Sequence, residues 1–430
     1  MNRPCTRREF VHHGLGLLGL GATAPAFLTR TVFALDDPRD RPLVSSPPGR
    51  PDDHVLVVLQ LAGGNDGLNT VVPHRNDDYY RARPRLSIDR RDVLRLNDEL
   101  GFHPSADGLK RLYDDGLLAV VQGVGYPNPN RSHFVSTEIW ETGDPTQRRH
   151  TGWVGRYFDA CCAGADPPDP KLAVALTREA PAALEGGRFR PVAFTAPDQL
   201  RWKSDDSHPD ARLLFERLNG AGAEDPSRPA GADGAPVSML DYVRRAALNA
   251  QLDVDRIREA VKVDAGKYRS PLEVDLAMVA QMISAGLPTR VYYVSLSGFD
   301  THSGQLGRHA ALMGQLGRGL TTFFADLQKL GVRDRVLLMT FSEFGRRVAQ
   351  NASGGTDHGQ AAPLFMAGTM VRGGLHGRSP SLRPGDLSRG DVTYTVDFRN
   401  VYAAAIADWL GGNAEAILGK GITPMKLLKI

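Results

Sequence analysis

Acidic residues follow three of the most apolar runs in the sequence, each in a short turn built from glycine or serine. Asp66 follows LQLAGGN, Asp300 and His302 follow SLSGF, and Glu343 follows MTFS. Apolar runs of this kind are typical of strands buried on both faces, and ligands of open parallel sheets gather outside the carboxyl ends of the strands. We therefore expect these side chains to converge at one edge of a sheet.

A glycine-rich loop soon after Glu343, with the sequence GGTDHG, adds an acid and a histidine. Carboxylates supply the hard oxygen ligands of divalent cations, whereas imidazole favours zinc, manganese or iron over calcium. The combination predicts a site for one or two divalent metal ions. Six residues are the candidate ligands: Asp66, Asp300, His302, Glu343, Asp357 and His358.

Each candidate ligand also has an interpretation that needs no metal. Asp66 follows two glycines, a position typical of a helix cap or an Asx turn. Glu343 has Arg346 and Arg347 within one helical turn and could pair with either. The histidines could be loop residues with ordinary hydrogen-bond partners. The occurrence of several acid-bearing turns in one chain is what favours the metal site.

A candidate nucleophile lies in the segment VVQGVGYPNPNRSHF, where a Pro/Asn/Gly turn leads into a helix expected from Ser136 to Trp140. Ser132 would lie near the amino end of that helix, where unpaired amides and the helix dipole stabilise negative charge and bind phosphate or sulfate oxygens. Arg131 and His133 are adjacent and could neutralise that charge. The alternative is that Ser132 serves only as an N-cap.

The elements that must position these residues alternate in type along the chain. Near-continuous apolar runs at 55–61, 117–121, 291–296 and 336–340 predict buried strands of a parallel sheet. Residues 309–330 and 272–285 have helical spacing, and the first of these leads through Gly331 into the last strand, as a βαβ crossover does. The pattern predicts an α/β fold.

The amino terminus has the features of an export signal. Arg7 and Arg8, followed by Phe10 and a short Gly/Leu run, are typical of a twin-arginine signal peptide, which we assign to residues 1–35. Residues 36–53 are rich in Pro, Asp and Arg and predict a linker, and residues 54–430 predict one domain with a mobile loop at 220–236. The expected location is periplasmic or secreted, and the translocase of that pathway is the expected partner during export.

Composition excludes several classes of protein. Basic and acidic residues nearly balance, 52 against 49, which leaves no excess charge to drive binding to nucleic acid. Beyond the signal no apolar run reaches membrane length, so we expect the mature form not to span a membrane. The sequence also lacks a Gly-x-Ser-x-Gly elbow, a Walker loop, a dinucleotide fingerprint and a His-Glu-x-x-His helix, which disfavours those chemistries.

Six motifs in a fixed order resemble a bacterial family known as the domain of unknown function fifteen hundred and one. They are LQLAGGNDGLNTVVP, NRSHF, TGWVGRY, GFDTH, TFSEFGRR and GGTDHGQAAP, beginning at residues 59, 130, 151, 298, 340 and 354. Members typically carry twin-arginine signals. The family is placed in the alkaline phosphatase-like superfamily, so the resemblance implies a largely parallel central sheet flanked by helices on both faces.

The superfamily pattern gives roles to residues that match it in order along the chain. The resemblance implies that Asp66 is the first ligand and Ser132 the nucleophile, with the later acid and histidine groups completing a two-metal site. This chain has Asp300-Thr301-His302 where the superfamily commonly has Asp-x-x-x-His, and Glu343-Phe344 in place of an Asp-His doublet. It also lacks the Cys/Ser-x-Pro-x-Arg signature of formylglycine sulfatases.

Together, the residues and the resemblance lead to a functional hypothesis. The chain is expected to be an exported metal-dependent hydrolase of phosphate or sulfate esters, acting on a small molecule or a surface polymer, with Ser132, His133 and Arg346 as catalytic residues. Arg346 would hold oxygens of the transferred phosphate or sulfate group, because a guanidinium contacts two oxygens at once. The Glu343-Phe344 departure supports the alternative, a catalytically inactive fold that serves as an exported binding or assembly protein.

Overall fold

The structure, a computed structural model, describes residues 54–161, 168–200, 257–259 and 261–429. The predicted signal, linker and mobile loop at 220–236 therefore lie outside the described residues. The chain divides into two compact units, and the larger contains the described residues up to 191 and from 263 onward. In the smaller unit the description includes strand β7 (Val192–Ala193) and the 3-10 helix η3 (Pro197–Leu200).

A mostly parallel sheet forms the centre of the larger unit. Its strands lie in the order β11 (Gly374–His376), β5 (Leu118–Gly125), β10 (Ala362–Ala367), β9 (Val336–Phe341), β1 (Val55–Ala62), β8 (Val291–Ser297) and β6 (Ala173–Ala175), with β12 (Val396–Asp397) beside β5. β1 pairs in parallel with β8 and β9, whereas β10 runs antiparallel to both β9 and β5. The four predicted strands are confirmed; β10 was not predicted.

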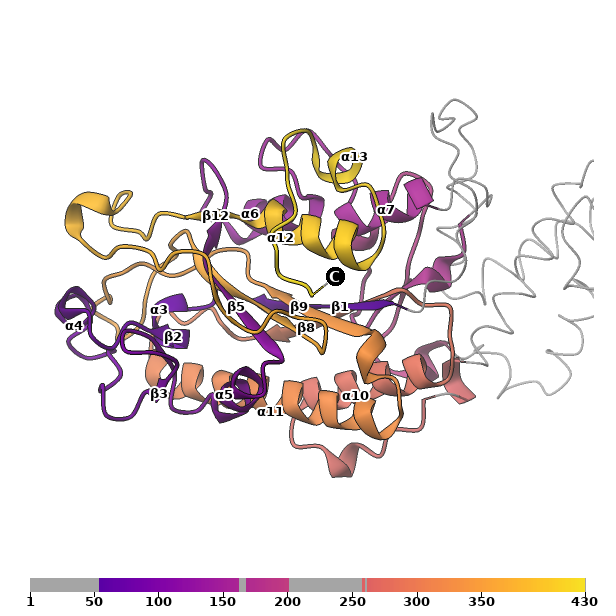
Figure 1. The fold of residues 1–430 in the computed structure, drawn as a ribbon, viewed down its shortest axis with the longest axis horizontal. Helices are drawn as coiled ribbons and strands as arrows, with labels where there is room; N and C mark the ends of the chain where they lie inside the picture. Colours follow the sequence, from indigo (N-terminus) through magenta and orange to yellow (C-terminus); the bar gives the residue numbers. More distant parts are fainter. Residues whose placement is uncertain (1–53, 162–167, 201–256, 260, 430) are drawn as a thin grey trace, which may run out of the picture. The chain divides into compact units, whose positions relative to one another are not determined.

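Helices cover both faces of this sheet (Figure 1). One face carries α5 (Asp107–Asp114), α10 (Pro271–Ser284) and α11 (Gln305–Lys329), and the other carries α6 (His133–Thr142), α7 (Trp153–Cys161), α12 (Phe398–Ala403) and α13 (Ala414–Leu418). The predicted α/β class, with helices on both faces of a largely parallel sheet, is confirmed. Within the described residues no helix is long and apolar enough to cross a membrane.

A small antiparallel sheet packs beside the carboxyl edge of the central one. It consists of β2 (Val71–Val72), β4 (Gly101–Phe102) and β3 (Leu94–Arg95) in that order. The short helix α3 (Gly67–Thr70) connects β1 to β2, and α4 (Asp77–Ala82) lies between β2 and β3 in the chain. Phe102 is fully buried and its ring contacts Phe365 of β10 edge-on, so the two sheets share apolar side chains.

Helix α6 is held against the sheet by buried aromatic rings. Trp140 stacks on Phe398 of α12 with ring centroids 4.4 Å apart and on Phe341 of β9 at 5.8 Å. Trp153 of α7 lies 4.7 Å from Tyr402. Large buried rings contribute heavily to core stability and leave little freedom for the elements that carry them. They hold α6 and α7 against the sheet and α12.

A buried carboxyl on α6 should make the stability of the fold depend on pH. Glu141 accepts a hydrogen bond from the Tyr293 hydroxyl at 3.2 Å, and burial raises the pKa of Glu141 from its ordinary value of 4.5 to about 7. The folded state binds the Glu141 proton more tightly than the unfolded state does. The stabilisation that this proton contributes is therefore complete below the pKa of Glu141 in the unfolded chain, and it is lost as the pH rises through the pKa in the folded protein.

Glu141→Gln should remove this dependence. As the pH rises from about 5 to about 8, the free energy of unfolding of the variant is expected to increase relative to that of the parent by on the order of 3 kcal/mol. Urea unfolding at the two pH values measures the change, and Glu138→Gln, an exposed position on the same helix, is the control. An unaltered pH dependence in Glu141→Gln would show that Glu141 is ionised in the folded protein.

Candidate metal centre

The turns after β1, β8 and β9 meet at the carboxyl edge of the sheet, and two glycines make their close approach possible. Gly63 and Gly64 have φ of 117° and 80°, values that L side chains rarely adopt. A Cβ atom on Gly63 would lie 2.4 Å from the backbone nitrogen of Asp300, and one on Gly64 would lie 2.4 Å from the Phe344 ring. The GGND sequence is thus required for the three turns to pack together.

Three histidines surround one oxygen of Asp300 at this edge. Oδ1 of Asp300 lies 3.1 Å from Nε2 of His302, 3.2 Å from Nε2 of His358 and 3.5 Å from Nε2 of His133. These four residues are called the His/Asp cluster below. Ligand atoms of His133, Asp300 and His358 all lie within 4.8 Å of one another, a spacing suited to a metal ion.

Glu343 lies behind His133 and orients its ring. Oε1 of Glu343 lies 2.8 Å from Nδ1 of His133 and accepts the backbone N–H of Gly63 at 2.8 Å. A carboxylate can only accept, so Nδ1 of His133 carries a proton, and in the neutral ring the lone pair of Nε2 points toward the cluster. That Nε2 is buried and has no hydrogen-bond partner among the described residues. A carboxylate behind an imidazole with a free second nitrogen is the usual support of a metal-bound histidine.

The ring of His358 is fixed in the same sense by the backbone. Its Nδ1 lies 2.7 Å from the carbonyl oxygen of Arg131, which accepts a hydrogen bond and leaves Nε2 with a lone pair. Burial lowers the pKa of His358, which favours the neutral ring. Nε2 of His358 also lies 2.9 Å from Nε2 of His302.

The donor set fits a divalent cation. Lone pairs of His133 and His358 face the carboxylate of Asp300, and acceptors that face one another repel unless a cation or a proton lies between them. Two or three imidazoles with one carboxylate suit zinc, manganese or iron. The hydrogen bond and charge of Arg346 overcome the effect of partial burial and lower the pKa of Asp300 to about 2, so Asp300 remains a carboxylate.

Asp357 supports the cluster from its solvent side. Its Oδ1 lies 3.1 Å from Nδ1 of His302 and accepts from the amide of Asn351 at 3.1 Å. These hydrogen bonds, from Asn351 first and then from His302, lower the pKa of Asp357 against the effect of burial. Asn351 also donates to the carbonyl oxygen of His302 at 2.9 Å. The sequence offered no motif that would have singled out Asn351.

Asp66 lies beneath the cluster and has different partners. It is the N-cap of α3, where its side chain accepts the backbone N–H of Leu68 at 3.2 Å, and it forms a fully buried ion pair with Arg83 at 2.6 Å. The amide of Gln305 donates to the same carboxylate oxygen as Arg83. Burial acts to raise the pKa of Asp66, but the charge of Arg83 prevails and lowers it. Asp66 therefore has the geometry of a helix cap, the alternative to a metal ligand. Its carboxylate oxygens are not among the clustered ligand atoms of His133, Asp300 and His358.

Arg346 is a structural link among the turns. Its guanidinium donates to the carbonyl oxygens of Gly63, Gly64, Phe299 and Thr356 and to Asp300 at 2.6 Å, and its side chain has no exposed surface. Sequence reasoning gave Arg346 a role in holding substrate oxygens. In this structure the guanidinium holds the turns together, and a role in contacting substrate oxygens stays a prediction.

Ser132 occupies the cap position of α6 without using its side chain as a cap. The helix begins at His133 rather than Ser136, and Ser132 makes no side-chain capping hydrogen bond. Its backbone N–H donates to Oδ1 of Asn130 at 2.7 Å, and the residue is exposed. The residues on either side, Arg131 and His133, both contact the cluster. Ser132 is therefore an exposed residue that directly precedes the cluster residue His133, and its hydroxyl is not engaged by the helix.

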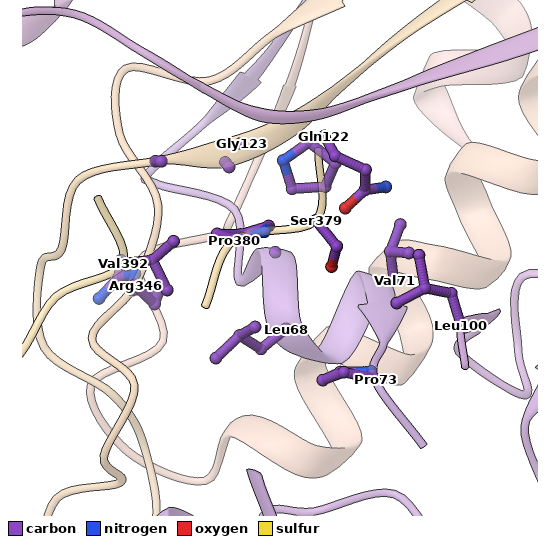
Figure 2. Close-up of a pocket in the computed structure, with 14 residues that line it drawn as sticks. Leu68, Val71, Pro73, Leu100, Gln122, Gly123, Arg346, Ser379, Pro380 and Val392 are labelled. Carbon is purple, nitrogen blue, oxygen red and sulfur yellow. The ribbon is translucent and has the colours of Figure 1, made fainter. Parts of the chain in front are cut away.

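A separate pocket has Arg346 in its lining (Figure 2). Its walls are mostly apolar, including Leu68, Val71 and Pro363. Gln122 of β5 projects into it, and the amide nitrogen of that side chain is buried without a hydrogen-bond partner among the described residues. Apart from Arg346, no candidate site residue lines this pocket.

Comparison with known proteins was made for both sequence and structure. The model of a family described as "Protein of unknown function (DUF1501)" matches residues 118–411. No curated protein matches the chain significantly.

Several solved structures are similar to this chain at low sequence identity. The lipoteichoic acid synthase LtaP from Listeria monocytogenes is 10% identical, with 81% of this chain and 73% of that chain covered and a TM-score of 0.33. The phosphonate monoester hydrolase SpPMH from Silicibacter pomeroyi is 11% identical, with 86% and 76% covered and a TM-score of 0.32. A protein in the alkaline phosphatase superfamily from Vibrio parahaemolyticus is 10% identical, with 83% and 71% covered and a TM-score of 0.30. Roles for individual residues must therefore come from the site itself.

Proposed function

The chain belongs to this family of unknown function, whose model matches most of its length, and from the geometry of its site we propose that it is an exported metal-dependent hydrolase of phosphate or sulfate esters. Export rests on the twin-arginine signal of residues 1–35 in the sequence, and the periplasm or the medium is the proposed location.

One observation carries the proposal. Nε2 of His133 is buried and unpartnered in the described part of the chain, and it points at Asp300 while Glu343 holds the opposite ring nitrogen. Leaving a buried polar atom unpaired costs about 1–3 kcal/mol, which folds accept chiefly where the atom has a ligand. His133, Asp300 and His358 would hold the cation, with His302 as a fourth donor and Glu343 and Asp357 as supports.

A bound cation would supply Lewis acidity, and the other roles belong to residues of this chain. Ser132 lies at the start of α6, where free backbone amides favour the negative charge of a phosphate or sulfate oxygen. We assign its Oγ as the nucleophile. It forms a bond to phosphorus or sulfur while the bond to the ester oxygen breaks, loses its proton to solvent, and the leaving oxygen takes one up. Water then hydrolyses the serine ester and restores the hydroxyl.

Elemental analysis together with turnover of aryl phosphates and aryl sulfates tests this function. The protein purified from its exported form is expected to contain zinc, manganese or iron, to hydrolyse at least one ester class, and to lose turnover on chelation and regain it on metal return. His376→Ala, which changes a histidine outside the cluster, should retain metal and activity. A protein with no bound metal and no turnover would rule the hydrolase out. Metal without turnover would favour the inactive binding protein instead.

A further inference from the structure

A single glutamine side chain connects the two loops that carry the His/Asp cluster. Gln305 is the first residue of α11 and is fully buried. Its Oε1 accepts hydrogen bonds from the hydroxyls of Thr301, at 3.1 Å, and Thr356, at 2.7 Å. Its backbone N–H donates to the carbonyl oxygen of Gly354 at 3.0 Å. Both loops therefore bond to the same residue.

The two threonines are placed directly beside cluster residues. Thr301 lies between Asp300 and His302 in the sequence, and Thr356 precedes the Asp357–His358 pair. Both threonines are fully buried, and the backbone N–H of Thr356 donates to the carbonyl oxygen of Thr301 at 3.2 Å. A shift of either hydroxyl would move a cluster side chain with it.

The other end of Gln305 is anchored to a fixed point in the interior. Its Nε2 donates to the Asp66 carboxylate, which Arg83 holds by a buried ion pair. Arg83 donates in turn to the carbonyl oxygens of Val348, at 2.8 Å, and Arg347, at 2.9 Å. The contacts run from the segment after β9, through Arg83, Asp66 and Gln305, to both loops.

We propose that Gln305 is a positioning residue that sets the distance between Asp300 and His358 and thereby the affinity of the His/Asp cluster for its metal. The inference rests on the proposed function, because it concerns the same site. It gives Asp66 the role of anchor for Gln305. A metal centre needs its ligands within about 0.5 Å of the binding geometry, and loops hold such precision only when buried hydrogen bonds lock them.

Gln305→Met keeps the approximate volume of the side chain and removes the hydrogen bonds of its two ends. Zinc affinity, measured by competition with a chelating dye, is expected to fall about 10- to 100-fold, and the visible spectrum of the cobalt-substituted protein is expected to change. Turnover at saturating metal is expected to fall as well. A purely structural role would lower the melting temperature and leave affinity and spectrum unchanged.

Gln122→Leu is the matched control. It also removes a buried glutamine amide, but the side chain projects into the separate pocket (Figure 2), and its amide nitrogen has no hydrogen-bond partner among the described residues. Its zinc affinity and cobalt spectrum should equal those of the parent protein. If Gln305→Met fails to fold, Thr356→Val decides the matter, because it removes only the 2.7 Å hydrogen bond to Gln305.

The outcomes separate this inference from the proposed function. If the parent protein binds no divalent cation, both fail. If the parent binds zinc and Gln305→Met, or Thr356→Val in its place, binds zinc equally well with an unchanged cobalt spectrum, the positioning role of Gln305 is refuted and the proposed function stands. Weaker binding with an altered spectrum, and a control that matches the parent, supports the inference.

Discussion

Ser132→Ala is expected to lower kcat/KM for the preferred aryl ester on the order of 10⁴-fold, because losses of this size follow the removal of a nucleophile from an otherwise intact site. Metal content should not change, since the clustered ligand atoms come from His133, Asp300 and His358 and not from Ser132. The hydroxyl is exposed at the start of α6 and is not used as a cap, so its removal should cost the fold little.

Steady-state kinetics and metal analysis on the same preparation measure both parts of this prediction. Ser379→Ala removes an exposed serine that lines the separate pocket and should behave as the parent protein. A Ser132→Ala protein that turns over at the parent rate would assign the attack to a water molecule, and the cluster would then act on that water directly. The metal-dependent hydrolase would stand, but without a covalent serine ester.

Arg83→Met is expected to destabilise the fold by about 3–5 kcal/mol, the usual cost of removing one partner from a buried ion pair. The carboxylate of Asp66 would remain buried with only Gln305 and the N–H of Leu68 as partners. Its pKa would then rise, because the charge of Arg83 is what holds that pKa down. Stability lost in this way should be partly recovered at low pH, where Asp66 takes up a proton.

Urea unfolding of Arg83→Met and of Arg83→Met with Asp66→Asn tests the pairing. The double variant has no buried charge left unpaired, so it should recover part of the loss, and the difference measures the coupling of the two residues. Arg91→Met, which breaks an exposed pair with Asp89, should leave the unfolding midpoint unchanged. A single variant as stable as the parent would mean that water reaches Asp66 in the folded protein.

The sequence predicted the central sheet well because the strands that build it are buried on both faces. The runs at 55–61 and 336–340 became β1 and β9 with ends shifted by a residue or so. Strand β10 was missed because its sequence, APLFMA, follows a glycine-rich loop and is no more apolar than many helices. Its antiparallel direction depends on pairing between β9 and β5, which no local pattern encodes.

In the site, too, the sequence predicted which residues gather at the sheet edge, but not the contacts that depend on tertiary packing. Asp300, His302, Asp357 and His358 lie together, since the strand-end turns that carry them share one sheet edge. His133 was interpreted as a charge neutraliser, and only the fold shows Glu343 bound to one of its ring nitrogens. No sequence pattern predicted the ion pair of Arg83 with Asp66, because Asp66 becomes buried only when α3 and the segment after β9 come together.

The position of β1 in the sheet has a consequence for how the chain reaches its final state. β1 is the first described strand, yet it lies between β8 and β9, where Leu56 pairs with Val291 and Leu337. A ribosome-bound chain cannot complete this sheet until residues beyond β9 have emerged, so β1 must wait unpaired through most of synthesis. Such long-range pairing folds slowly and exposes apolar strands meanwhile. The central sheet of this unit should therefore be completed only after β9 has been synthesised.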